Sequence, residues 1–134
     1  GETVTMAGFG LAIEDNKATA RRLRETRLVN AGSYTTANTV KVAVDVEARG
    51  ESPGAGACRG DSGGPVLRGP ASSRDLVGVV SWSSGPLNSR VRRICGGFTA
   101  ITPISDHRGW ITEASQRLLA FGADGRRGEP EPPQ

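Results

Sequence analysis

Short runs of β-branched and apolar residues, separated by turn residues, recur along most of this chain. The clearest alternation lies at 40–46, where valine occupies every even position. A period of two is typical of a strand with one buried face, so this segment predicts a half-buried strand. Similar but weaker patterns predict further strands at 3–7, 23–29, 65–67, 76–82 and 98–101. The chain is therefore expected to be built mainly from strands.

A single helix is expected near the end of the chain. Ile111, Ala114 and Leu118 recur at helical spacing, which predicts an amphipathic helix over 105–119. The segment 14–17 is expected to be an exposed loop. The segment 121–134 is rich in glycine, proline and charge, so a disordered tail is expected there after a globular domain over 1–120.

Composition supports an all-β domain. The chain has 134 residues, enough for one domain with a modest core. Its 19 glycines and eight prolines indicate many turns. Aromatic residues make up only 4% of the chain, so the core must come mostly from valine, leucine, isoleucine and alanine.

Charge and polar clusters exclude several classes of function. The net charge is +3, and the basic residues are scattered rather than interleaved with aromatics, which argues against nucleic-acid binding. No apolar run approaches the length of a membrane span, so no membrane partner is expected.

The chain has two cysteines, no CxxC or His/Cys cluster, and a single histidine, His107, so we expect no metal or cofactor. Two cysteines are consistent with one disulfide and an oxidising compartment.

The segment 58–65, Cys-Arg-Gly-Asp-Ser-Gly-Gly-Pro, carries the candidate chemistry. Three glycines crowd one serine, Ser62, and glycine is favoured where the backbone takes positive φ or approaches another group closely. A serine in such a turn is presented to solvent, and nearby backbone N–H groups can converge on one point, as an oxyanion requires. The alternative is a glycine-rich turn without chemistry. The six residues 60–65 argue against it, because together they match a known signature, described next.

The residues 60–65 resemble, letter for letter, the nucleophile signature of trypsin/chymotrypsin-like serine proteases. Three further segments are similar to the same family: Gly-Phe-Gly at 8–10, Ser-Trp-Ser at 81–83 and Gly-Trp-Ile at 109–111. The resemblance covers 3 to about 119 and matches only the second half of that family. It implies a six-stranded antiparallel Greek-key barrel followed by a C-terminal helix, with the N-terminal barrel absent.

The resemblance also implies roles in catalysis. Ser62 would be the nucleophile of an endopeptidase that acts on protein or peptide substrates through an acyl-enzyme. The N–H groups of Gly60 and Ser62 would hold the oxyanion. Asp61 would pair with an N-terminal ammonium released by cleavage of a precursor. Without that amine the buried carboxylate would be costly, and the turn would then be disordered or repacked.

A specificity pocket is implied beside the nucleophile. Its walls would include Gly56, Ala57, Ser81, Trp82 and Ser83, braced by a disulfide between Cys58 and Cys95. Trypsin-like members carry an aspartate where this chain has Gly56, so apolar or aromatic side chains are the expected substrates. Ser83 stands where the family usually has glycine and is expected to narrow the mouth of the pocket.

The histidine and aspartate of the family's catalytic triad come from its first barrel. His107 has no counterpart in that triad and is expected to be a surface or helix-start residue. We therefore expect an N-terminal half to supply both groups. The alternative is a protease-like binding module without catalysis. An esterase would need a Gly-x-Ser-x-Gly elbow between a strand and a helix, which does not fit this sequence. A secreted or periplasmic, bacterial origin is expected.

Overall fold

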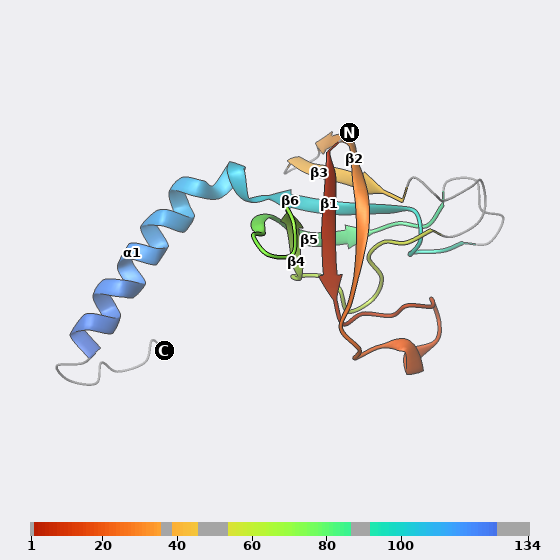
Figure 1. Ribbon diagram of the computed structural model, residues 1–134, viewed down its shortest axis with the longest axis horizontal. Coiled ribbons are helices and arrows are strands. Elements are labelled where there is room, and N and C mark those ends of the chain that lie inside the picture. The colour runs from red at the N-terminus through yellow and green to blue at the C-terminus, as the bar shows by residue number, and fades with distance from the viewer. Residues whose placement is uncertain (1, 36–38, 46–53, 87–91, 126–134) are drawn as a thin grey trace. The chain divides into compact units, whose positions relative to one another are not determined.

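The computed structural model describes residues 2–35, 39–45, 54–86 and 92–125. Within them, six antiparallel strands form a closed barrel in the order β1-β2-β3-β6-β5-β4, in which β4 pairs back onto β1 (Figure 1). The strands are β1 (Thr3–Gly8), β2 (Arg24–Thr35), β3 (Thr39–Val44), β4 (Pro65–Arg68), β5 (Asp75–Ser83) and β6 (Phe98–Pro103). This is the six-stranded barrel that the resemblance implied, and all expected strands are present.

Three helical segments accompany the strands. The 3₁₀ turn η1 (Lys17–Thr19) lies between β1 and β2, and η2 (Ile104–His107) leads into helix α1 (Arg108–Gly125). The expected helix is confirmed, although it spans Arg108–Gly125 rather than 105–119, and a 3₁₀ turn occupies Ile104–His107. The chain divides into a barrel unit through Ile104 and a second unit from Ser105 onward that contains α1. In the part of the chain that the structure describes, no helix has the length and apolar character needed to cross a membrane.

The barrel interior is filled by at least one apolar side chain from every strand. These buried residues are Val4, Met6, Leu28, Ala43, Val66, Val80 and Ile101. Alternate residues of a barrel strand face inward, and burial of such side chains is the main favourable term in folding. Branched aliphatic groups dominate this core, as the low aromatic content requires.

The inward face of β3 differs from the face that the valine pattern indicates. Ala43 belongs to the core cluster, whereas Val40, Val42 and Val44 lie on the other face of the strand, where Val40 is buried and the other two are half-buried. A small side chain at position 43 fits an interior that larger side chains of the other strands already fill. The alternation therefore identified the strand correctly but not its inward face.

A bulge in β5 has consequences for the candidate site. Val80 pairs with Ile101 and Trp82 pairs with Ala100, so Ser81 is an extra residue without a partner in β6. Such bulges turn a strand locally and redirect the groups beside them. Here the bulge lies beside the glycine-rich turn that carries Ser62.

A glycine in β5 is required by core packing. A Cβ at Gly78 would lie 2.3 Å from Cγ2 of Ile101, a contact that no relaxed structure contains. We predict that Gly78→Ala lowers the free energy of unfolding by about 1–3 kcal/mol, because overpacking forces the core to shift. Urea unfolding followed by circular dichroism measures this change.

Two further variants test the cause. Ile101→Ala removes the clashing methyl, so the double variant should be less destabilised than the sum of the two single variants. Gly122→Ala in α1 meets no atom within 4 Å and serves as a control that should leave barrel stability unchanged. Strict additivity of Gly78→Ala and Ile101→Ala would show that the two positions do not clash.

Candidate active site

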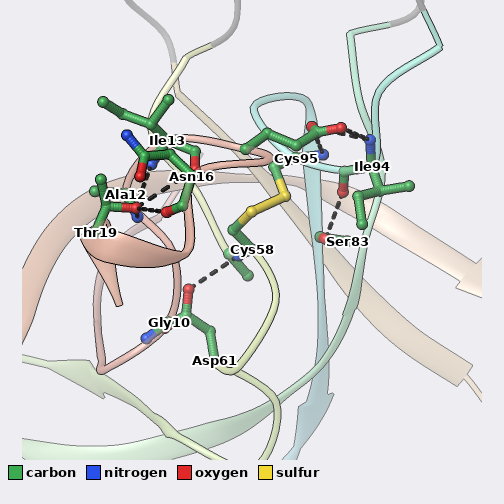
Figure 2. The surroundings of a disulfide bond; sticks show 12 residues. Gly10, Ala12, Ile13, Asn16, Thr19, Cys58, Asp61, Ser83, Ile94 and Cys95 are labelled. Atoms are coloured by element: carbon green, nitrogen blue, oxygen red, sulfur yellow. Dashed lines mark hydrogen bonds between the residues drawn. A yellow bond between two sulfur atoms is a disulfide. The ribbon is translucent and has the colours of Figure 1, made fainter. Parts of the chain in front are cut away.

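The carboxylate of Asp61 is the centre of the turn from Cys58 to Gly64. The side chain is only 7% exposed. Its Oδ1 accepts the N–H of Gly10 at 2.8 Å, and its Oδ2 accepts the N–H of Cys58 at 2.9 Å (Figure 2). Hydrogen bonds from backbone N–H groups satisfy a buried carboxylate. The carboxylate of Asp61 is therefore satisfied by donors of the protein itself.

Two glycines at the end of β1 make room for this carboxylate. A Cβ at Gly8 would lie 2.1 Å from Asp61 Oδ1, and a Cβ at Gly10 would lie 2.5 Å from Asp61 Cγ. Any larger residue would therefore collide with the carboxyl group. The Gly-Phe-Gly segment and the serine-bearing turn are thus complementary, although they lie 51 residues apart.

Ser62 is exposed at the tip of this turn. Its Oγ donates to the carbonyl oxygen of Ser81, the bulged residue of β5, at 3.2 Å. The turn is tied to β5 by two further bonds, from Gly63 N–H to Val80 O at 2.8 Å and from Val80 N–H to Gly64 O at 3.0 Å. The nucleophile candidate therefore sits against the strand that also carries Trp82.

The backbone donors of the turn divide into two groups. The N–H of Asp61 bonds to Cys58 O at 3.1 Å, and the N–H of Gly64 bonds to Asp61 O at 3.1 Å. Among the described residues, the N–H groups of Gly60 and Ser62 donate to no protein acceptor. Gly60 has a φ of +94°, a conformation that glycine adopts without strain. The free N–H groups of Gly60 and Ser62 therefore lie on either side of Asp61 in the chain.

A disulfide joins the turn to the segment before β6. Cys58 and Cys95 are bonded across a sequence separation of 37 residues (Figure 2). The predicted pairing is therefore present.

The segment 54–57, which contains the expected pocket residues Gly56 and Ala57, is held in place by three hydrogen bonds from its backbone N–H groups. Gly54 N–H bonds to Gly96 O at 2.8 Å, and Ala55 N–H bonds to Asp45 Oδ2 at 2.7 Å. Ala57 N–H bonds to the buried hydroxyl of Thr99 at 2.9 Å. The preceding residues, 46–53, lie outside the described residues. Gly56 and Ala57 are thus fixed close to β6.

The second expected wall is the end of β5. Ser81, Trp82 and Ser83 extend beyond Val79, the last β5 residue paired with β4 on this side. Among the described strands, only β6 pairs with Trp82 and Ser83, and the bulged Ser81 has no strand partner. The Ser83 hydroxyl donates to Ile94 O at 2.6 Å. Trp82, 42% exposed, makes an edge-on contact with Tyr34 at a ring-centroid distance of 6.1 Å. This contact was not predicted, because Tyr34 belongs to no motif in the sequence.

A cavity of about 480 Å³ lies between the segment after β1 and the disulfide. Asp61, Gly10, Glu14, Cys58 and Cys95 are among the residues that line it. Among the described residues, no group of histidine, cysteine and acidic side chains could hold a metal ion. The cavity thus joins the buried carboxylate to the disulfide wall.

Glu14 is a site residue that sequence reasoning missed. It was expected in an exposed loop, yet it is half-buried. Its carboxylate accepts the N–H of Ile94 and the N–H of Cys95, the latter at 2.9 Å. An acidic residue in a loop gives no local signal of a contact 80 residues away.

His107 lies in η2, within the unit that begins at Ser105. As expected, it stands at the start of the C-terminal helix.

A closed antiparallel barrel, a glycine-rich turn that presents a serine and a disulfide beside it together define a trypsin-like barrel. The sequence model of the trypsin family, described as Trypsin, matches residues 1–111. This chain therefore belongs to the trypsin family.

The chain is also similar in sequence to a known protein. The chain is 46% identical over 63 residues to hypodermin-B of Hypoderma lineatum, a match that covers 45% of this chain and 20% of that protein. The chain thus spans about a fifth of the length of this relative.

Asp61 should be essential to the stability of the turn. We predict that Asp61→Ala lowers the free energy of unfolding by about 2–4 kcal/mol, because two buried N–H groups lose a charged acceptor. Urea denaturation measures the loss. Asp75→Ala, which removes an exposed aspartate from β5, is the matched control and should change stability by about 0.5 kcal/mol or less. Equal effects of the two substitutions would contradict this role.

Proposed function

We propose that this chain supplies the nucleophile, the oxyanion hole and the specificity pocket of a trypsin-like serine endopeptidase. The observation that carries the proposal is the exposed side chain of Ser62 in a turn where the backbone N–H groups of Gly60 and Ser62 are both free. The carboxylate of Asp61 holds this turn. Membership of the trypsin family supports it. A protein without catalysis has no need of free donors beside an exposed hydroxyl.

In the proposed mechanism the Ser62 Oγ attacks the carbonyl carbon of the scissile peptide bond. The carbonyl oxygen becomes an oxyanion, which the N–H groups of Gly60 and Ser62 stabilise. One donor of this kind contributes about 3–4 kcal/mol to the transition state. The base takes the Ser62 hydroxyl proton during this attack and gives it to the amine as the intermediate collapses and the C–N bond breaks. Water, which gives a proton to the same base, then attacks the acyl-enzyme, and the base returns that proton to Ser62 Oγ as the ester bond breaks.

A serine hydroxyl needs an adjacent base to act as a nucleophile at neutral pH. In the described residues Ser62 Oγ bonds to a backbone carbonyl, which is not a base. We therefore assign the catalytic histidine and aspartate to an N-terminal half of the protein. The hydroxyl would turn from Ser81 O toward that histidine when the two halves meet.

Asp61 would have a second role in activation. The cavity of about 480 Å³ reaches its carboxylate and has room for the end of a chain. An N-terminal ammonium entering there would pair with Asp61 and strengthen the hold on the oxyanion turn. In this proposal the bonds from Gly10 and Cys58 prepare the carboxylate to receive the amine.

The pocket formed by Gly56, Ala57 and the segment 81–83 would take an apolar or aromatic side chain. Position 56 carries no acid, and Ala57 is buried against the Thr99 hydroxyl. The unpaired edge of Ser81 to Ser83 would bind the substrate backbone as an added strand. The disulfide supports a secreted or periplasmic location, and a bacterial source fits the single cysteine pair.

The division of the catalytic groups can be tested with a fluorophosphonate probe. The isolated chain should label at Ser62 at a rate at least about 10³-fold lower than the same chain joined to its upstream region, because the base is missing. Ser62→Ala in the joined protein is the control and should abolish labelling. Strong labelling of the isolated chain would overturn the division, and no labelling of either protein would favour a binding module without catalysis.

Substrate preference gives a second test. A peptide library digested by the complete protein should show cleavage after apolar or aromatic residues. Gly56→Asp should shift cleavage toward arginine and lysine, because a carboxylate at the base of the pocket pairs with a cationic side chain. Cleavage dominated by arginine and lysine in the unchanged protein would contradict the assigned pocket.

A further inference from the structure

We propose that Glu14 is a positioning residue that holds the oxyanion turn in its competent form. The proposal rests on the proposed function of that turn. Glu14 lies four residues beyond Gly10, and its Oε1 accepts two N–H bonds, from Ile94 at 3.1 Å and from Cys95 at 2.9 Å. Oε2 lies 3.2 Å from the same Ile94 nitrogen. Figure 2 shows Ile94 and Cys95 beside the disulfide.

These bonds complete a closed ring of interactions around the cavity. From Asp61 the ring passes through the Gly10 N–H and along the chain to Glu14. It then crosses to the Cys95 N–H, continues through the disulfide to Cys58, and returns by the Cys58 N–H to Asp61. Two carboxylates thus close the ring at two points. Loss of either one would leave the remaining contacts in an open arrangement that bends more easily.

The segment that carries Glu14 is braced so that its carboxylate is aimed at the Cys95 segment. The Thr19 Oγ1 accepts the N–H groups of Ala12 and Ile13, and it donates to Asn16 O at 2.7 Å. Asp15, directly after Glu14, has a φ of +67°. Aspartate is among the few non-glycine residues that adopt this conformation, so the turn that carries Glu14 suits its sequence.

The ring also reaches the substrate-binding edge. Ile94, whose N–H binds Glu14, offers its carbonyl oxygen to the Ser83 hydroxyl. Ser83 is the last residue of β5 and belongs to the expected wall of the pocket. Glu14 therefore connects the support of the oxyanion turn with the strand that would hold the substrate.

This arrangement predicts a loss of kcat when the ring is opened. In Glu14→Ala the turn would spend only a fraction of the time in its competent form. The oxyanion exists only in the transition state, so the substrate would bind both forms of the turn alike, and kcat would fall by that fraction while KM changes little. We expect kcat of the complete, full-length protein to fall about tenfold, with KM within about twofold of the original value. Glu14→Gln keeps the oxygen that accepts both N–H bonds and should restore kcat to within about threefold.

Glu25→Ala is the matched control. Glu25 lines the same cavity, but its carboxylate forms a salt bridge with Arg74, which does not line the cavity. The control should leave kcat and KM unchanged. A merely structural role for Glu14 would lower the melting temperature but leave kcat at lower temperature equal to that of Glu25→Ala, and that result would overturn the proposal.

Hydrogen exchange separates this proposal from the proposed function. The amides of Gly10 and Cys58, which donate to Asp61, should exchange about tenfold faster in Glu14→Ala than in Glu25→Ala, because the ring opens locally. If the full-length protein hydrolyses no peptide, the function fails while this exchange result still decides the role of Glu14. Equal exchange in the two variants would refute it whatever the activity.

Discussion

The two hydrogen bonds that the Asp61 carboxylate accepts are the constraint on which the site depends. They join Gly10, which lies just after β1, to Cys58, which begins the serine-bearing turn. A buried carboxylate without such donors would be strongly unfavourable, so these bonds fix the path of the turn. That path leaves Ser62 exposed and the N–H groups beside it free.

The barrel provides the rigid support that this turn requires. Gly78 lets Ile101 fill the interior, and the bulge at Ser81 places a carbonyl oxygen next to the Ser62 hydroxyl. Side chains built on strands of a packed barrel keep their positions better than side chains on free loops. The disulfide and Glu14 then attach the segment before β6 to the same turn. The site is therefore a set of loops fastened to one another at the end of a closed sheet.

Sequence reasoning identified the features that local pattern encodes. The strands follow from period-two alternation, and the turn follows from three glycines around Ser62, so both were predicted. The pairing of Cys58 with Cys95 came from the family resemblance and is present. The inward face of β3 was not predicted, because the choice of Ala43 depends on what the other strands place in the core. Glu14 and Tyr34 could not be predicted either, since their partners lie far away in the sequence.

The crystal structure of the Asp61→Ala variant tests the central claim most directly. If the carboxylate holds the turn, residues 58–64 will follow a different path in this variant, and the Ser62 hydroxyl will no longer lie against the carbonyl oxygen of Ser81. A turn that keeps its path, with Gly60 and Ser62 unmoved, would contradict the account.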